Sequence, residues 1–522
     1  MGAELHISAH ARAPEHVDVL ILGAGLSGIG AACQLRMREP SRSVAILEAR
    51  SSIGGTWDLF RYPGIRSDSD MYTLGYSFRP WEGADALADG ASILRYVRDT
   101  AREHAVEGLV RFDHTALSAS WSSRDAVWTV LAEDAGSGEQ VLITCDFLWA
   151  CTGYYRYDEG YCPVFADAEC FRGEIVHPQH WPSDLDCRGR RVVVIGSGAT
   201  AVTLVPALVA QGAAHVTMLQ RSPTYVVSVP QQDRLARRLR RTLSPQRAYQ
   251  LLRWRNVLQM IASFGLSRRA PRMTAALLKA LVRRQLPAGY DVERHFSPSY
   301  APWDQRLCMA PDGDLFAAIS EDRAAVVTAQ IAGFTETGVR LADGEILEAD
   351  VIVTATGLNL LVLGGMELTV DGEHVELGDA LAYKGMMLCG VPNLALTLGY
   401  PNASWTLKAD LVAEYVCRLL AHMRDNGAKI CTPRRPRGQL SRSPVLNLKA
   451  GYVLRSLESM PMQGARTPWR LHDNYIRDAM MLRHGPIDDE MDFSAPKPMP
   501  APVEQASAAG EAPAAQAFSG IR

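Results

Sequence analysis

The sequence of 522 residues lacks the marks of several common protein classes. Its ten cysteines include no CxxC pair, which argues against a disulfide framework and favours an intracellular, cytoplasmic protein with free thiols. The net charge of −3 shows no excess of basic residues, so a nucleic-acid-binding protein is not expected. No uninterrupted apolar run reaches the roughly 20 residues that span a membrane. These absences leave a globular chain, long enough for three to four domains of roughly 150 residues each.

Two local features resemble a signal sequence and a metal site, but the residues around them favour a structural explanation. The apolar stretch 19–33 contains four glycines and follows Glu15 and Asp18 rather than basic residues, so it favours a buried strand and a helix start over a signal sequence. His177 and His180 form an HxxH pair, but no second ligand pair has a suitable spacing, so we expect no metal site.

Two segments of the sequence repeat one pattern: an apolar strand, a glycine turn and a helix of small residues. They are 17–35 and 191–211, and a further apolar strand follows each, at 44–49 and 216–221. Each unit is typical of a βαβ fold that binds a dinucleotide. We therefore predict an α/β protein with two Rossmann-like dinucleotide-binding domains.

The glycines of the first unit are spaced as G-x-G-x-x-G, at Gly23, Gly25 and Gly28. This spacing allows a tight turn, a close approach of the backbone to a pyrophosphate and close packing of helix on strand. Ser27 is placed to join this cradle. Glu48 ends the second strand, where a carboxylate accepts a hydrogen bond from a free ribose 2′-hydroxyl, so this unit favours an adenosine such as that of FAD or NAD.

The second unit differs at the position that selects the nucleotide. Its motif is Gly196-x-Gly198-x-x-Ala201, and its second strand is followed by Arg221 rather than by an acid. An arginine there pairs with a 2′-phosphate, which predicts NADPH; the alternative is an arginine that is only a surface charge. The economical assignment is FAD in the first unit and NADPH in the second, with further contacts in the second cradle from Ser197, Ala199, Thr200 and Ser222.

A third signature lies between the two units, where residues 171–182 read FRGEIVHPQHWP. The stretch 54–72, GGTWDLFRYPGIRSDSDMY, forms a further motif. Both resemble motifs of the type I Baeyer–Villiger monooxygenases, and across roughly 17–493 the sequence is similar to the ethionamide-activating branch of that family. The residues that match the fingerprint F-x-G-x-x-x-H-x-x-x-W-P are Phe171, Gly173, His177, Trp181 and Pro182.

The resemblance implies bound FAD, NADPH and O₂, and a C4a-peroxyflavin that inserts one oxygen atom next to a ketone carbonyl to give an ester or lactone. It also implies oxygenation of sulfides and thioamides. The apolar segment 358–366 favours small apolar substrates. Two alternatives stay open: an N- or S-oxygenating flavin monooxygenase with a non-ketone substrate, and a membrane-surface binding protein on a flavin fold. A disulfide reductase is rejected, because it needs a redox pair of cysteines beside the flavin, and five residues rather than two separate Cys145 from Cys151.

By the same resemblance, the family's catalytic arginine is Arg306, and Asp68 orients it and contacts the cofactors. An arginine suits the stabilisation of an anionic oxygen because it stays charged when desolvated. The alternatives are an ordinary ion-paired Arg306 and a helix-capping Asp68. Gln305 stands where relatives often carry a lysine that assists the 2′-phosphate, so the degree of preference for NADPH over NADH is open.

The remaining site residues are implied by the resemblance alone. His177 is expected to be a structural or hinge residue on the linker, with a general base as the alternative. The residues expected along the flavin or the nicotinamide nucleotide are Thr56, Trp57, Arg66, Ser67 and Ala116.

Segment 231–294 is strongly basic, with 14 arginines and Lys279 against three acidic residues. Its pattern predicts amphipathic helices, which we read as a helical insertion in the second domain, either a solvated basic face over a substrate cleft or a peripheral contact with the anionic inner face of the membrane. The expected organisation is a flexible N-terminus at 1–16, an FAD domain at 17–155 and 358–493, an NADPH domain at 165–230 and 298–350, the insertion at 231–297 and a disordered Ala/Pro tail at 494–522.

Overall fold

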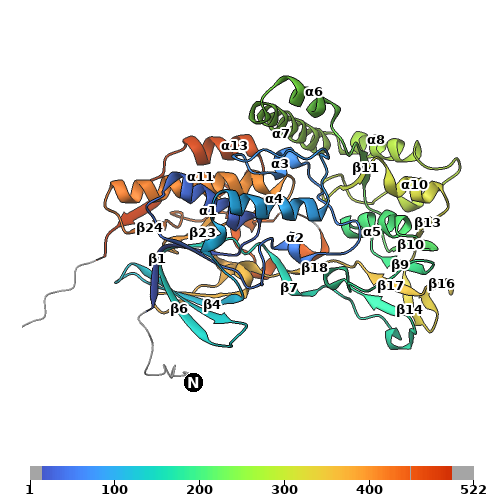
Figure 1. The fold of residues 1–522 in the computed structure, drawn as a ribbon, viewed down its shortest axis with the longest axis horizontal. Coiled ribbons are helices and arrows are strands. Elements are labelled where there is room, and N and C mark those ends of the chain that lie inside the picture. Colours follow the sequence, from blue (N-terminus) through green and yellow to red (C-terminus); the bar gives the residue numbers. More distant parts are fainter. Residues whose placement is uncertain (1–13, 447, 449, 497–522) are drawn as a thin grey trace, which may run out of the picture.

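The described part of the protein contains two large β-sheets, each covered by helices, and the chain passes between them twice (Figure 1). The computed structural model describes residues 14–446, 448 and 450–496. The predicted α/β fold with two Rossmann-like units is confirmed.

The first sheet has nine strands in the order β20-β19-β4-β5-β6-β1-β2-β3, and β23 pairs with β6. Its Rossmann half is parallel, and β4, β5 and β6 form an antiparallel meander. The strands are β1 (Glu15–Leu22), β2 (Val44–Leu47), β3 (Val110–Arg111), β4 (His114–Ser122), β5 (Val127–Asp134), β6 (Gln140–Ala150), β19 (Glu367–Val370), β20 (Glu373–His374) and β23 (Leu394–Leu396).

The second sheet has five parallel strands in the order β13-β10-β9-β17-β8. Its central strands are almost continuous runs of buried valine and isoleucine, as a parallel sheet covered on both faces requires. The strands are β8 (Glu174–Val176), β9 (Arg191–Ile195), β10 (His215–Gln220), β13 (Ala324–Thr328) and β17 (Val351–Thr354).

Helices of small and apolar residues cover both sheets. Over the first sheet lie α1 (Leu26–Arg38), α4 (Gly90–Glu103) and α11 (Trp405–Asp425), whose buried side chains form one core with the strands (Figure 1). The second core is formed with α5 (Ala199–Ala210) and α10 (Asp314–Ser320). Both α1 and α5 begin directly at a glycine of a predicted nucleotide motif.

Short elements complete the chain. The short helices are α2 (Thr56–Leu59), α3 (Met71–Leu74), α12 (Gly451–Leu454) and α13 (Tyr475–Ala479). The strands outside the two sheets are β7 (Tyr155–Gly160), β11 (Val226–Val229), β12 (Cys308–Pro311), β14 (Ile331–Thr335), β15 (Gly338–Leu341), β16 (Ile346–Glu348), β18 (Leu358–Leu360), β21 (Ala382–Tyr383), β22 (Met387–Leu388), β24 (Ile430–Pro433), β25 (Arg442–Pro444), β26 (Met462–Gly464) and β27 (Met491–Ser494).

The two passages between the sheets lie side by side. The first continues from β6 into β7, and the second continues from β17 into β18; β7 and β18 pair as antiparallel strands. This pairing fixes the two crossing segments against each other, and it directs residues of both into the space between the sheets.

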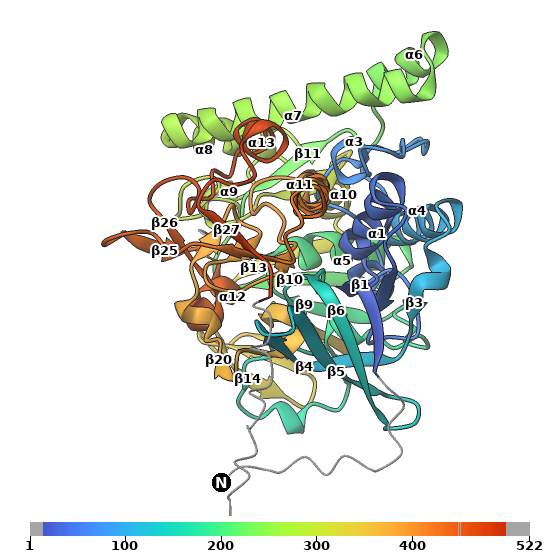
Figure 2. The same ribbon diagram turned by 90° about the vertical axis from the view of Figure 1, so that its left-hand side faces the viewer.

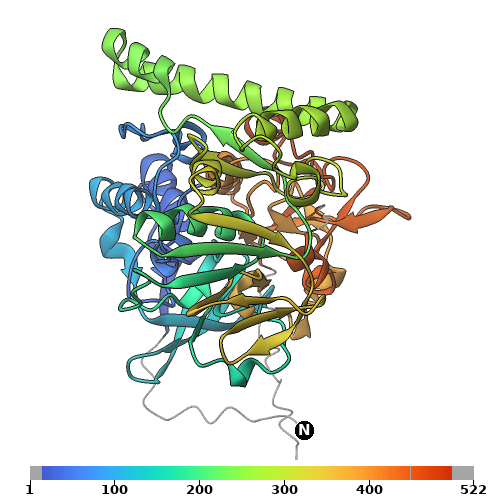
Figure 3. The same ribbon diagram turned by 90° about the vertical axis from the view of Figure 1, so that its right-hand side faces the viewer.

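The helical insertion consists of α6 (Arg234–Thr242), α7 (Pro245–Arg269), α8 (Pro271–Arg283) and α9 (Val292–His295). It is inserted between β11 and β12. Its helices α6, α7 and α8 form an outer layer along one edge of the molecule (Figures 2 and 3). Although it is inserted in the second unit, α7 packs against α3 of the first.

Buried Arg253 fastens α7 to the first unit. Its guanidinium donates to Asp410 on α11 at 2.8 Å, and to the carbonyl oxygens of Tyr72, Thr73 and Gly75 at 3.0, 3.3 and 2.7 Å. Arg253 and Asp410 are 8% and 3% exposed. An ion pair buried so completely is strongly destabilised when one partner is removed, because the other charge is left without compensation.

The expected termini differ slightly from the described strands. β1 begins at Glu15, inside the segment 1–16 that was expected to be flexible, and β27 ends at Ser494, the first residue of the expected tail. Residues 1–13 and 497–522 lie outside the described residues. Over the described part of the chain, no helix combines the length and the apolar character needed to cross a bilayer.

We predict that Arg253→Met lowers the free energy of unfolding by about 3–5 kcal/mol, because Asp410 stays buried without its partner. Denaturant unfolding followed by fluorescence measures this. Arg283→Met is the matched control, since Arg283 and Glu293 are 60% and 59% exposed and such a surface pair contributes about 0–1 kcal/mol. Equal losses in the two variants would contradict the anchoring role of Arg253.

Candidate active site

One large cavity of about 1640 Å³ lies at the carboxyl ends of the parallel strands of both sheets. Leu22 and Leu47 end β1 and β2 on one side, and Ile195 ends β9 on the other; all three line the cavity. Ligands of open α/β sheets bind at this edge. The volume exceeds the roughly 300–1,000 Å³ of a site for one small molecule, so there is room for two dinucleotides.

The first glycine loop is closely packed on the chain that follows β6. Gly23 has φ +98°, and a Cβ there would lie 2.8 Å from the carbonyl oxygen of Cys151. A Cβ at Gly28 would lie 1.8 Å from the carbonyl oxygen of Gly23, so only glycine allows the helix to begin this close to the strand. Gly25 is the N-cap of α1 and lines the cavity, which leaves free N–H groups of the helix start facing the cavity.

Glu48 and Ser27 both accept hydrogen bonds from other residues of the protein. The Glu48 carboxylate accepts from the backbone N–H of Ala24 at 2.6 Å and of Arg50 at 3.0 Å. Burial raises the pKa of Glu48, and these two hydrogen bonds act in the opposite direction. Ser27 Oγ accepts from the indole N–H of Trp405 at 2.6 Å. Both residues line the cavity, and each keeps an unused lone pair or proton for a ligand.

The second glycine loop has the same build but is more open. Gly196 has φ +144°, and a Cβ there would lie 2.2 Å from the carbonyl oxygen of Ala355. A Cβ at Gly198, the N-cap of α5, would meet nothing within 4 Å, so this glycine leaves open space in front of the helix. Ala201 is buried against the strand, as a third small residue should be. The other predicted cradle residues, Ser197, Ala199, Thr200 and Ser222, line the cavity.

Arg221 follows β10, is exposed and lines the cavity beside Ser197 and Ser222. The Ser197 hydroxyl donates to the carbonyl oxygen of Ser222 at 3.0 Å, which ties the glycine loop to the Arg221 segment. Arg221 forms no ion pair with any other described residue. A cation without a partner at this position is suited to a phosphate.

Arg306 and Asp68 face each other between the two loops. Arg306 Nε lies 2.6 Å from Asp68 Oδ2, and its Nη2 lies 2.9 Å from Oδ1, so the guanidinium is held side-on by both oxygens. Asp68 raises the pKa of Arg306 above its ordinary value, so the arginine stays charged. The capping alternative for Asp68 is wrong: the N-cap of α3 is Asp70, whose carboxylate accepts from the Thr73 N–H at 3.1 Å.

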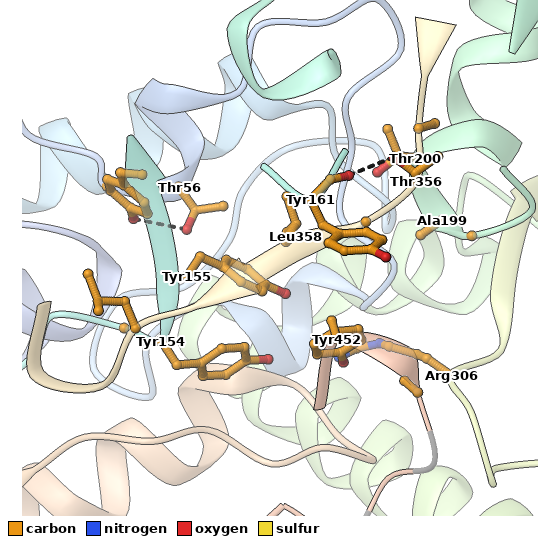
Figure 4. A pocket seen from close by; sticks show the side chains of 18 of the residues that line it. Thr56, Tyr154, Tyr155, Tyr161, Ala199, Thr200, Arg306, Thr356, Leu358 and Tyr452 are labelled. Carbon is orange, nitrogen blue, oxygen red and sulfur yellow. Dashed lines mark hydrogen bonds between the residues drawn. The ribbon is translucent and has the colours of Figure 1, made fainter. Parts of the chain in front are cut away.

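Three tyrosines around Arg306 were missed by sequence reasoning. Tyr154 and Tyr155 come from the first crossing segment and Tyr452 from α12, and all three point toward the Arg306 guanidinium (Figure 4). We call these three residues the tyrosine wall. The signal in the sequence was the density of tyrosine in GYYRYDEGY (153–161), but density alone does not say where the side chains point.

The other predicted cofactor residues also line the cavity, but not all are free. Arg66 forms an ion pair with Asp314 at 2.6 Å, and Ser67 accepts from the Ser69 N–H at 3.0 Å. The Thr56 hydroxyl lies 3.2 Å from that of Tyr157. Trp57 and Ala116 also line the cavity.

The fingerprint residues hold the linker and do not line the cavity. His177 Nδ1 accepts from the Gln179 N–H at 3.2 Å, and Nε2 lies 3.3 Å from the Gly357 carbonyl oxygen. Burial lowers the pKa of His177. Phe171 packs on Phe334, a Cβ at Gly173 would lie 2.4 Å from the Asp350 carbonyl, and the half-buried Trp181, followed by Pro182, packs on the second core. The arrangement favours the hinge interpretation over a general base.

No group of three or more His, Cys, Asp or Glu side chains within 14–446, 448 and 450–496 could hold a metal ion.

Comparison with known proteins defines the class. Residues 21–83 match the model of an NAD(P)-binding Rossmann-like domain, and residues 85–362, more than half of the chain, match that of the flavin-binding monooxygenase-like proteins. The chain belongs to this flavin-binding monooxygenase-like family. The predicted enzyme class and its flavin cofactor are thereby confirmed.

Individual proteins of this family and of similar fold can be compared with the chain directly. The chain is 55% identical over 489 residues to the FAD-containing monooxygenase EthA of Mycobacterium tuberculosis, covering 94% of this chain and 100% of that protein. It is 45% identical to the probable FAD-binding monooxygenase AlmA of Acinetobacter baylyi over 91% and 95% of the two chains. The fold is similar to that of a steroid monooxygenase bound to NADP, with a TM-score of 0.72, 24% identity, and coverage of 92% and 99%.

Proposed function

We propose that the first glycine loop holds FAD, the second holds NADPH, and the chain inserts one oxygen atom of O₂ next to the carbonyl of a small apolar ketone, giving an ester or lactone, and also oxygenates sulfides and thioamides. One observation carries this proposal: the paired Arg306 and Asp68 stand in a single cavity that both nucleotide cradles line. When bound and reduced, the flavin supplies the activation of O₂ and the transfer of one oxygen atom.

In the first cradle, the N-terminus of α1 holds the pyrophosphate, because its free N–H groups face the cavity at Gly25. Glu48 accepts the ribose hydroxyl with the lone pairs that Ala24 and Arg50 leave unused. Thr56 and Trp57 border the flavin, and Ala116 borders the adenine.

In the second cradle, the N-terminus of α5 holds the pyrophosphate of NADPH, and the open space at Gly198 lets the phosphate approach the backbone. Arg221 and Ser222 bind the 2′-phosphate. Arg66 and Ser67 border the nicotinamide end, near the ion pair.

Arg306 stabilises the negative charge that develops on oxygen during transfer. Its charge is fixed before the reaction, so no proton has to move to provide it. Asp68 holds the guanidinium plane through two hydrogen bonds and keeps its pKa high. Val164, Leu358, Leu361 and Leu454 contribute apolar side chains to the cavity lining, which favours a ketone or thioether with an apolar remainder.

A second observation concerns the outer layer of the insertion. On α7, Leu251, Trp254, Leu258 and Leu266 follow one another at helical spacing and are 47–54% exposed. Met273, Leu277 and Leu281 continue this on α8. We call these seven residues the apolar stripe. Half of all exposed large apolar side chains among the described residues belong to the insertion.

The charges beside the apolar stripe match an anionic surface. Seven arginines of the insertion form neither an ion pair nor a side-chain hydrogen bond within the described residues, and they lie on α6, α7 and α8 or directly after α8: Arg234, Arg238, Arg241, Arg247, Arg269, Arg272 and Arg284. Apolar side chains flanked by unpaired arginines are suited to the interface of an anionic bilayer. We therefore propose a cytoplasmic enzyme that contacts the inner face of the membrane through this edge (Figure 2).

For the reaction, we predict that Arg306→Ala lowers the rate of product formation about 10²–10³-fold, because the fixed charge at the developing anion is lost. Bound flavin should be retained. Product analysis by mass spectrometry with a ketone and a sulfide of equal chain length measures this. Arg455→Ala is the control and should change the rate little, because Arg455 is exposed, lines the same cavity and lies over the Tyr161 ring. Unchanged oxygenation in Arg306→Ala would refute the assignment.

For the nucleotide, we predict that Arg221→Gln raises the KM for NADPH about 10- to 100-fold, the value of a charge-assisted hydrogen bond, and leaves the KM for NADH unchanged. Steady-state oxidation of the two nucleotides measures the ratio. Equal changes for both nucleotides would mean that Arg221 does not read the 2′-phosphate.

For the membrane contact, we predict that the protein sediments with vesicles of phosphatidylcholine and phosphatidylglycerol, but not of phosphatidylcholine alone, and that salt weakens binding. Leu258→Glu combined with Leu277→Glu should abolish sedimentation. Leu142→Glu combined with Ile346→Glu, two exposed apolar side chains elsewhere, should not. Equal sedimentation with anionic and with neutral vesicles would refute the proposal. If the apolar-stripe variant loses self-association rather than vesicle binding, the stripe is an interface between copies of the chain, which also refutes it.

A further inference from the structure

The tyrosine wall is held in place by a chain of contacts that reaches the first glycine loop. The Tyr154 ring lies 4.7 Å from that of Tyr155 and 5.1 Å from that of Trp405, measured between ring centroids. Trp405 in turn donates its indole N–H to Ser27. Tyr155 is fixed from the other side, because it pairs with Leu360 where β7 meets β18. The phenol groups therefore have defined positions before any ligand arrives.

The wall offers three phenol hydroxyl groups, each of which can donate a hydrogen bond, beside the positive charge of Arg306. Burial raises the pKa of Tyr154, Tyr155 and Tyr452 above the ordinary value for tyrosine, so all three stay protonated at every working pH. Arg306, which they face, carries only donors. Asp68 is the carboxylate beside them, and each of its two oxygens accepts a hydrogen bond from Arg306.

A donor-rich wall discriminates between substrates by charge and by hydrogen-bonding type. A neutral group with an acceptor oxygen or sulfur, such as a ketone or thioamide, receives a hydrogen bond from a phenol. A protonated amine carries the same sign of charge as Arg306, so placing it against the guanidinium costs free energy even though a phenol oxygen can accept a hydrogen bond from it.

We propose that Tyr154, Tyr155 and Tyr452 determine substrate specificity, by binding the acceptor atom of a neutral carbonyl or thiocarbonyl substrate and excluding cationic amines. This inference rests on the proposed function of the cavity, and it separates the ketone and sulfur chemistry from N-oxygenation of amines.

The test uses the flavin-loaded enzyme and the variants Tyr154→Phe, Tyr155→Phe and Tyr452→Phe, which keep the rings and remove only the hydroxyls. The probe is N,N-dimethyloctanamide, an unreactive carbonyl compound without donors, and its dissociation constant is measured by calorimetry without NADPH. Tyr161→Phe is the matched control, since Tyr161 lines the same cavity but its ring lies under Arg455 at 3.5 Å, away from Arg306 (Figure 4).

We expect at least one wall variant to bind the amide about 3- to 10-fold more weakly, the value of one neutral hydrogen bond, while Tyr161→Phe binds it normally. The wild-type enzyme should oxygenate octan-2-one and leave octylamine unchanged. Amide binding that is the same in all variants, or octylamine oxygenated as fast as octan-2-one, overturns the inference. Absence of any oxygenated product in the wild type refutes the proposed function instead, and the calorimetry still tests the wall.

Discussion

The ion pair of Arg306 and Asp68 is the interaction on which the arrangement of the site depends. Asp68 lies in the loop before α3 of the first unit, and Arg306 lies just before β12 of the second. The pair therefore joins the two units at the point where their nucleotide cradles meet. A guanidinium held side-on by a carboxylate keeps both its charge and its plane, and a fixed charge of this kind stabilises an anion without rearrangement.

The rest of the structure holds the two units in the positions that bring Arg306 and Asp68 together. The two parallel sheets present their carboxyl ends to one cavity, and the pairing of β7 with β18 fixes the crossing segments beside it. His177 Nε2 lies within hydrogen-bond distance of the Gly357 carbonyl oxygen, between β17 and β18, so the fingerprint contacts the second crossing segment. The same segments carry Tyr154 and Tyr155, so the elements that hold the units together also shape the wall around Arg306.

The insertion shows how one buried charge pair decides the position of a whole layer. The sequence places it within the second unit, yet Arg253 fastens α7 to α11 and to the carbonyl groups of α3 and its C-cap. As a result, the apolar face of α7 that looks inward is covered by the first unit, and the outward face carries the apolar stripe. Which arginine of fourteen is buried could not be read from their spacing, because nearly every helical face of the segment contains one.

The sequence by itself determined the two nucleotide folds, because strand, glycine turn and helix are local and their spacing is fixed by the backbone geometry that each requires. It also determined the contrast between Glu48 and Arg221, which follow equivalent strands. Only the tertiary structure decided that Asp70 rather than Asp68 caps α3, that Ser27 serves Trp405, and that the tyrosines converge on Arg306. The contacts of Ser27 and of the tyrosines join residues from separate elements that are far apart along the chain, and their distances depend on tertiary packing, which no local pattern contains.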